Sequence, residues 1–101
     1  MARHVTAGPD ISAARWLLEQ GVVAAGSDTE TFEVQPAPDP GSPANPQPVH
    51  TLLLIENAIY LFESIYLEDL ARDRVYEFLF VALPIKVKGA TGSMLDPVAI
   101  I

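Results

Sequence analysis

Apolar residues at helical spacing run from Ala13 to Leu17 within "DISAARWLLEQG". Asp10 or Ser12 can cap the start of this segment, because short polar side chains accept the unpaired N–H groups of a first helical turn. Gly21 can end it, since glycine adopts the left-handed conformation that commonly follows a helix. The pattern therefore predicts a helix over these residues.

Short apolar runs predict the remaining elements. The run from Val75 to Val87 is almost continuously apolar, which is typical of a central strand covered on both faces. Asn57 can end a short buried helix, because asparagine tolerates left-handed geometry. The sequence predicts strands over Val22–Asp28, Ala58–Glu63, Val75–Val87 and Pro97–Ile101, short helices over Val49–Glu56 and Leu67–Ala71, and a tight turn over Gly89–Ser93. This order indicates an α/β or mixed α+β chain.

A proline-rich segment divides the chain. Residues 35–48 contain six of the nine prolines, so we expect a loop without regular structure. A loop of this length inside a small domain is either functional or an arm that lies on a partner. We expect residues 1–9 to form a flexible tail and residues 10–101 to form one domain.

Composition restricts the function. The chain has 101 residues, half of them hydrophobic, and a mean hydropathy of +0.25, so we expect some apolar surface to be covered in a homo-oligomer or by a partner chain. A net charge of −7 argues against nucleic acid as a partner. Cysteine is absent, which excludes disulfides and thiolate chemistry. No apolar run is long enough to cross a membrane, and we expect a cytoplasmic protein.

The candidate chemistry centres on "PVHTLLLIENAIYLFESIYLEDL". His50 opens the predicted short helix and Glu63 ends the next strand, so both can face one cleft as metal ligands or as an acid–base pair. As an isolated pair they are more often polar residues at the ends of buried elements. The other candidates are substrate-binding residues, although an ordinary turn is the favoured interpretation at both places: Asp28 and Thr29 at a strand end, and Thr91 and Ser93 in the Gly89–Ser93 turn.

Three stretches together resemble a known family. They are "ISAARWLLEQGVVAAGSDT", "VHTLLLIENAIYLFE" and "VYEFLFVALPIKVKGATGSMLDPVAII". Their order and spacing are similar to the C-terminal half of the cyclase family of metal-dependent hydrolases, which includes kynurenine formamidase and isatin hydrolase. The resemblance covers about residues 10–101. It implies half of a swivelling β/β/α fold, with a mixed sheet and two main helices.

The resemblance also implies a reaction. Members of the family hydrolyse an amide or lactam, as in the arylformamidase step of tryptophan catabolism, with a water bound to Zn²⁺ or Mn²⁺. His50 and Glu63 match the two metal ligands that the C-terminal half supplies. The other ligands come from a His-x-Gly-Thr-His-x-Asp motif, which this sequence lacks; it has only two histidines, His4 and His50.

Three interpretations follow from the resemblance. The chain is part of a metal-dependent hydrolase, inactive alone and completed by a second polypeptide or by a second copy across a symmetric interface. Alternatively, it is a non-catalytic half-domain that oligomerises or regulates a full-length relative. It could also be a shortened remnant, because its first residues match the start of the family's second half.

Overall fold

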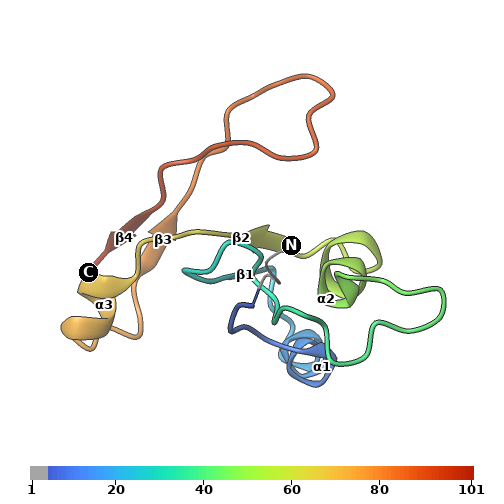
Figure 1. Cartoon of the computed structure of the whole chain (residues 1–101). Coiled ribbons are helices and arrows are strands. Elements are labelled where there is room, and N and C mark those ends of the chain that lie inside the picture. Colours follow the sequence, from blue (N-terminus) through green and yellow to red (C-terminus); the bar gives the residue numbers. More distant parts are fainter. Residues whose placement is uncertain (1–4) are drawn as a thin grey trace. The chain divides into compact units, whose positions relative to one another are not determined.

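The computed structural model describes residues 5–101 (Figure 1). They form two units, which divide between Tyr66 and Leu67 and are described separately. The elements are mixed α and β, as the sequence predicts. Among the described residues, no helix is long and apolar enough to cross a membrane.

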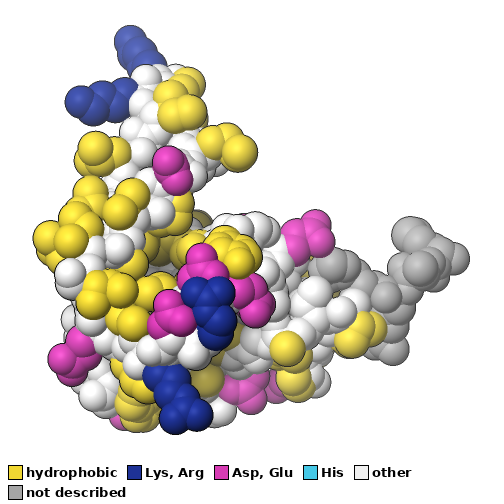
Figure 2. Space-filling view, turned by 90° about the vertical axis from the view of Figure 1, so that its left-hand side faces the viewer, with side chains coloured by type: hydrophobic (Ala, Val, Ile, Leu, Met, Phe, Trp, Pro, Cys, Tyr) yellow, Lys and Arg dark blue, Asp and Glu magenta, His cyan; other side chains and the backbone are white. Residues whose placement is uncertain are grey.

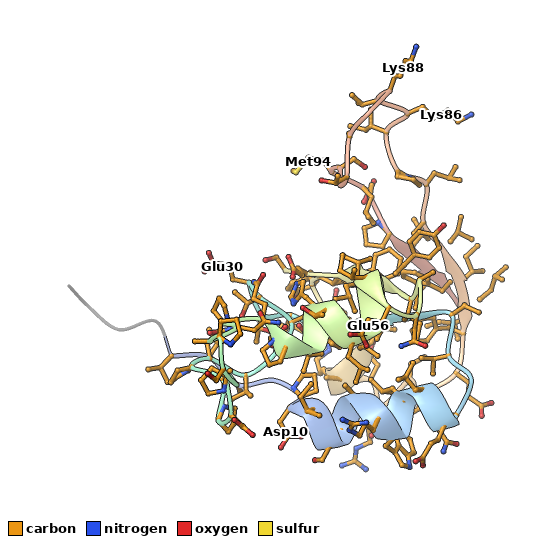
Figure 3. The ribbon with its side chains drawn as sticks, turned by 90° about the vertical axis from the view of Figure 1, so that its right-hand side faces the viewer. Asp10, Glu30, Glu56, Lys86, Lys88 and Met94 are labelled. Carbon is orange, nitrogen blue, oxygen red and sulfur yellow. The ribbon has the colours of Figure 1, made fainter. Side chains whose placement is uncertain are left out.

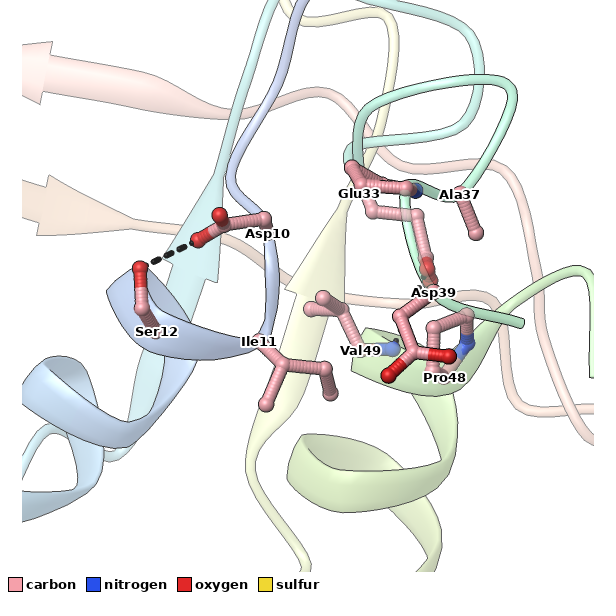
Figure 4. A pocket seen from close by; sticks show the side chains of 9 residues that line it. Asp10, Ile11, Ser12, Glu33, Ala37, Asp39, Pro48 and Val49 are labelled. Atoms are coloured by element: carbon pink, nitrogen blue, oxygen red, sulfur yellow. Dashed lines mark hydrogen bonds between the residues drawn. The ribbon is translucent and has the colours of Figure 1, made fainter. Parts of the chain in front are cut away.

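Helix α1, Ile11–Glu19, confirms the first predicted helix. The carboxylate of Asp10 accepts the Ala13 N–H at 3.0 Å, so Asp10 is the cap. The Ser12 hydroxyl instead donates to Asp10 at 2.6 Å, as the dashed line in Figure 4 shows. The hydrogen bond from the Ser12 hydroxyl is the larger cause, and that from the Ala13 N–H the smaller, of a pKa of Asp10 below its usual value. Gly21 has a φ of 71°, which is the left-handed end that the sequence predicts.

The first unit contains a parallel pair of short strands. β1, Ala24–Gly26, pairs with β2, Tyr60–Phe62, in the register Ala24 to Tyr60 and Gly26 to Phe62. Both strands are shorter than predicted. Parallel strands require a crossover, and here the proline-rich loop and a helical segment supply it.

That helical segment has two parts. α2, Pro48–His50, runs directly into η1, a π-helical turn over Thr51–Ile55, so the predicted helix begins one residue earlier than expected. The Glu56 N–H donates to the Thr51 carbonyl at 3.0 Å, five residues back, which is the π-helical pattern. Ala58, and not Asn57, has the left-handed backbone, with a φ of 54°. The Asn57 amide donates to the Leu52 carbonyl instead.

The core of the first unit lies between α1, the α2–η1 segment and β2. Its buried apolar residues are Ala14, Phe32, Val49, Leu53 and Ile59. Trp16 is 58% exposed and does not belong to it. The described residues before α1 are attached to this unit, since Thr6 and Gln35 exchange two backbone hydrogen bonds of 3.0 Å.

The proline-rich loop has no helix or strand between Pro36 and Gln47, as predicted. It is nevertheless bonded to its surroundings. The Gln35 amide donates to the Pro46 carbonyl at 2.9 Å, and the Asn45 amide donates to the Thr51 hydroxyl at 2.8 Å. The loop is therefore tied to the first turn of η1.

The second unit holds α3, Glu68–Arg72, and an antiparallel pair, β3, Leu79–Val81, and β4, Val98–Ile100. A sixteen-residue loop joins the two strands, and Lys86 and Lys88 project from it (Figure 3). Every residue of β3 is exposed. The prediction of a long central strand covered on both faces is therefore wrong.

The strands form two separate two-stranded sheets. A single mixed sheet with two main helices, expected from the family resemblance, is not what the described residues show. The mixed α+β class holds, whereas the swivelling β/β/α type stays a prediction. The sheets are small because each strand pairs over three residues.

Candidate functional site

Three side chains from separate segments meet in the first unit. His50 Nε2 lies 2.7 Å from Glu63 Oε1, and His50 Nδ1 lies 2.5 Å from Glu33 Oε2. The imidazole is thus held between two carboxylates. We call Glu33, His50 and Glu63 the carboxylate–histidine cluster. The sequence predicts that His50 and Glu63 lie together, and the structure brings them together.

Glu33 is the member that the sequence interpretation missed. Its side chain is only 1% exposed, and it is the one charged residue buried among those described. Its carboxylate accepts the backbone N–H groups of Val49 at 3.1 Å and of His50 at 2.8 Å, besides contacting the imidazole. Burial of a carboxylate requires such partners, because desolvation otherwise costs several kcal/mol.

An unusual backbone carries Glu33. Phe32, directly before it, is buried and has a φ of 60°, a left-handed conformation that is rare for a large side chain. Gly8 packs against this turn so closely that a Cβ there would lie 2.2 Å from the Phe32 carbonyl oxygen. Backbone of this kind is typical of places where a side chain must be aimed at a particular point.

His50 is positioned by the start of the helical segment. Its backbone N–H lies in the first turn, where helical N–H groups have no partner within the helix. The buried carboxylate of Glu33 supplies that partner and holds the ring at the same time. The π-helical turn η1 begins at the next residue, and such turns occur frequently at functional sites.

Glu63 follows the last residue of β2, at the carboxyl end of the parallel pair. Functional groups of α/β proteins gather at this end of parallel strands. The Ser64 N–H donates to the Thr29 carbonyl at 2.9 Å, which fixes the chain just after Glu63. The Glu63 side chain is 37% exposed and that of His50 is 18% exposed, so the cluster opens to solvent on the Glu63 side.

Thr29 has a structural role in this unit. Its hydroxyl contacts the Ser27 hydroxyl at 2.8 Å and donates to the Phe32 carbonyl at 3.4 Å. It therefore connects the end of β1 with the turn that carries Glu33. Asp28 is exposed on the same turn. Substrate binding by Asp28 and Thr29 stays a prediction.

Thr91 and Ser93 lie in the second unit. Both are exposed, and the Ser93 hydroxyl donates to the Met94 carbonyl at 3.1 Å. The turn in this region is at Lys88 and Gly89, where Gly89 has a φ of 79°. A role for Thr91 and Ser93 in substrate binding also stays a prediction. The second histidine, His4, lies outside the described residues.

A second acidic group surrounds α3 and is exposed. Arg72 contacts Asp69 and Asp73 at 2.9 Å each. The hydrogen bond that Arg72 donates to Asp73 and the charge of Asp69 raise the pKa of Arg72. Exposed ion pairs of this kind contribute little to stability. They indicate a solvated helix face.

A small hollow is lined in part by Glu33 and by residues of the α1 start and the proline-rich loop. Its volume is about 90 Å³. Figure 4 shows Asp10, Ile11, Asp39 and Val49 around it. The space is large enough for a few water molecules.

The described residues supply two possible ligands on one side of the imidazole, His50 Nε2 and a Glu63 oxygen. Glu33 contacts the opposite ring nitrogen and so cannot share a cation with them. Within residues 5–101, no group of three or more His, Asp or Glu side chains is arranged to hold a metal ion. Alone, the cluster can act as a histidine base held by carboxylates, or as part of a metal site.

Comparisons of this chain with protein-family models, with curated proteins and with solved structures give no match. The functional interpretation therefore depends on the cluster and on the sequence resemblance.

Proposed function

We propose that this chain carries part of the site of a metal-dependent amide or lactam hydrolase of the cyclase type, an arylformamidase-like enzyme. His50 and Glu63 are the two metal ligands that it supplies. The observation that supports this proposal most is the 2.7 Å distance between His50 Nε2 and Glu63 Oε1, across thirteen residues of sequence. The pair that the family resemblance selects is also the pair that the fold brings into contact.

The chemistry of the donor atoms suits Zn²⁺ or Mn²⁺. Imidazole nitrogen and carboxylate oxygen are common ligands of both ions. A metal-binding histidine usually donates its other ring N–H to a carboxylate, and Glu33 is placed to accept it. The cluster therefore has a donor set and an orienting group that fit a metal site.

A divalent ion, when bound, polarises a carbonyl and acidifies water, which is the chemistry that amide hydrolysis needs. The residues of this chain would bind the ion and orient its histidine ligand. The cluster is open to solvent at Glu63, and Glu33 holds the His50 ring at Nδ1. Because catalytic zinc sites have three protein ligands, we propose that a second polypeptide or a second copy completes the shell.

A second candidate function is a non-catalytic half-domain that oligomerises. One observation favours it: no residue of Leu67–Ile101, all of which the structure describes, is buried. Figure 2 shows hydrophobic side chains at the surface, and those of the second unit include Leu79, Leu83, Ile85 and Met94. A two-stranded sheet with exposed apolar residues on both sides needs a cover to be stable.

One experiment separates the two functions. Purified protein is loaded with Zn²⁺ or Mn²⁺, its bound metal is measured by mass spectrometry, and its mass is measured by analytical ultracentrifugation. The hydrolase proposal predicts bound metal that His50→Ala removes and that His4→Ala, the matched control at the other histidine, retains. A metal-free oligomer without activity on a formamide substrate would contradict completion of the metal shell by a second copy and support the oligomerising half-domain.

A further inference from the structure

When His50 is neutral, the two carboxylates of the carboxylate–histidine cluster flank a ring that has one proton to donate. A neutral imidazole carries a single ring proton, on Nδ1 or on Nε2. Glu33 lies at Nδ1 and Glu63 at Nε2, both within hydrogen-bond distance. Only one of them can accept a hydrogen bond from the neutral ring, and the surroundings decide which one does.

Glu33 is fixed in place. Its side chain is 1% exposed, and the N–H groups of Val49 and His50 hold its two oxygens. If Nδ1 lacked a proton, its lone pair would face a lone pair of Glu33 Oε2 at 2.5 Å, and the buried carboxylate could not turn away. In surroundings of low dielectric, an unsatisfied contact of this kind is costly.

Glu63 has an alternative. Its side chain is 37% exposed, so its carboxylate can turn toward water when Nε2 has no proton to donate. A water molecule replaces such a hydrogen bond at little cost. The two contacts of the imidazole are therefore unequal, although their lengths differ by only 0.2 Å.

We propose that Glu33 is a positioning residue that keeps the proton of neutral His50 on Nδ1. The lone pair of Nε2 then faces Glu63 and the solvent, where a cation can bind it. The left-handed backbone of Phe32 and the close approach of Gly8 aim Glu33 at the ring. The statement about the proton stands on the geometry alone, whereas its consequence for metal affinity rests on the proposed function.

The first test is nuclear magnetic resonance of the two ring nitrogens of His50 in metal-free protein labelled with ¹⁵N, at alkaline pH. His4→Gln assigns the signals, because the chain has two histidines. We expect His50 to carry its proton on Nδ1 in the wild type and in Glu63→Gln, and to shift toward Nε2 in Glu33→Gln. A wild-type proton on Nε2, or an unchanged distribution in folded Glu33→Gln, overturns the proposal.

The Glu63→Gln variant keeps the test decisive if Glu33→Gln does not fold. Glu63 is partly exposed, so its substitution leaves the core intact. If the proton leaves Nδ1 when Glu63 is changed, then Glu33 does not hold it and the proposal fails. Glu56→Gln is the matched control for removing a carboxylate, because Glu56 is exposed at the end of the same helical segment (Figure 3).

The second test measures Zn²⁺ affinity by calorimetry. Loss of a carboxylate that orients a metal-binding histidine lowers metal affinity about 10- to 100-fold, so we expect this loss in Glu33→Gln and none in Glu56→Gln. Equal affinity in wild type and Glu33→Gln overturns the proposed consequence. If the wild type binds no metal, a second copy does not complete the proposed metal site, while the position of the ring proton still decides the role of Glu33.

Discussion

Replacement of Gly8 by alanine tests whether the turn that carries Glu33 depends on close backbone packing. A Cβ at this position would lie 2.2 Å from the Phe32 carbonyl oxygen, 2.6 Å from the Glu33 carbonyl carbon and 2.8 Å from the Val34 nitrogen. To restore a contact of 3.0 Å, the oxygen and the new methyl group must separate by 0.8 Å. All three atoms belong to the backbone, so no side-chain rotation relieves the overlap.

We therefore expect Gly8→Ala to cost about 2–3 kcal/mol of unfolding free energy, the upper part of the range for overpacked sites. In urea this lowers the midpoint by roughly 1 M or more. Circular dichroism follows the unfolding. Gly92→Ala is the matched control, because a Cβ at Gly92 meets no atom within 4 Å. Equal midpoints for Gly8→Ala and wild type would refute the close packing of Gly8 against the Glu33 turn.

Two further predictions concern the first unit. Leu53 is fully buried, so Leu53→Ala should cost about 2–5 kcal/mol in the same urea assay. Leu54→Ala, next to it and 38% exposed, should cost much less, and equal losses would contradict the assignment of the core. Asp10→Ala should destabilise the protein at neutral pH, because α1 loses its cap. Since the folded-state pKa of Asp10 lies below its ordinary value of 3.8, the stabilisation is present above that value and disappears as the pH falls through the lowered pKa. Urea midpoints of both proteins over a pH series check this; a difference that persists in strong acid would contradict it.

Local signals in the sequence predict the first unit well. Asp10 and Gly21 delimit α1 because a cap and a left-handed end act over a few residues and need no distant partner. The prolines between Pro36 and Gln47 exclude regular structure for an equally local reason. His50 and Glu63 were predicted to meet, and this too follows from the order of a helix start and a strand end.

The prediction from sequence was wrong where the extent of a strand depends on the segments that pair with it and cover it. The run from Val75 to Val87 is apolar enough for a covered central strand, yet only Leu79–Val81 pairs, and it pairs with β4 alone. Apolar character reports that a residue favours burial, without stating which surface buries it. Pro84 adds a local limit, since it has no N–H to donate to a neighbouring strand.

Glu33 was missed because its signal is weak in sequence. It stands between Phe32 and Val34, and an acid flanked by two apolar residues also occurs on the exposed face of any strand. Recognising it required knowing that the chain reverses at Phe32 in a left-handed conformation, which large side chains adopt rarely. No motif encodes that turn, and Gly8, which allows it, is 24 residues away in the chain.

The burial of Glu33 also bears on whether the cluster is a functional site or only a set of polar residues at the ends of buried elements. A buried carboxylate is a poor means of stabilising a core, because well-packed apolar side chains often serve equally well or better. Here it is accompanied by a left-handed phenylalanine and a glycine without room for a methyl group. The carboxylate caps the start of the helical segment through the Val49 and His50 N–H groups, and it also holds the imidazole, which capping alone does not require. Had His50 and Glu63 been only the polar ends of buried elements, water would have satisfied both. The buried carboxylate of Glu33 instead orients the His50 ring, and this favours a functional site.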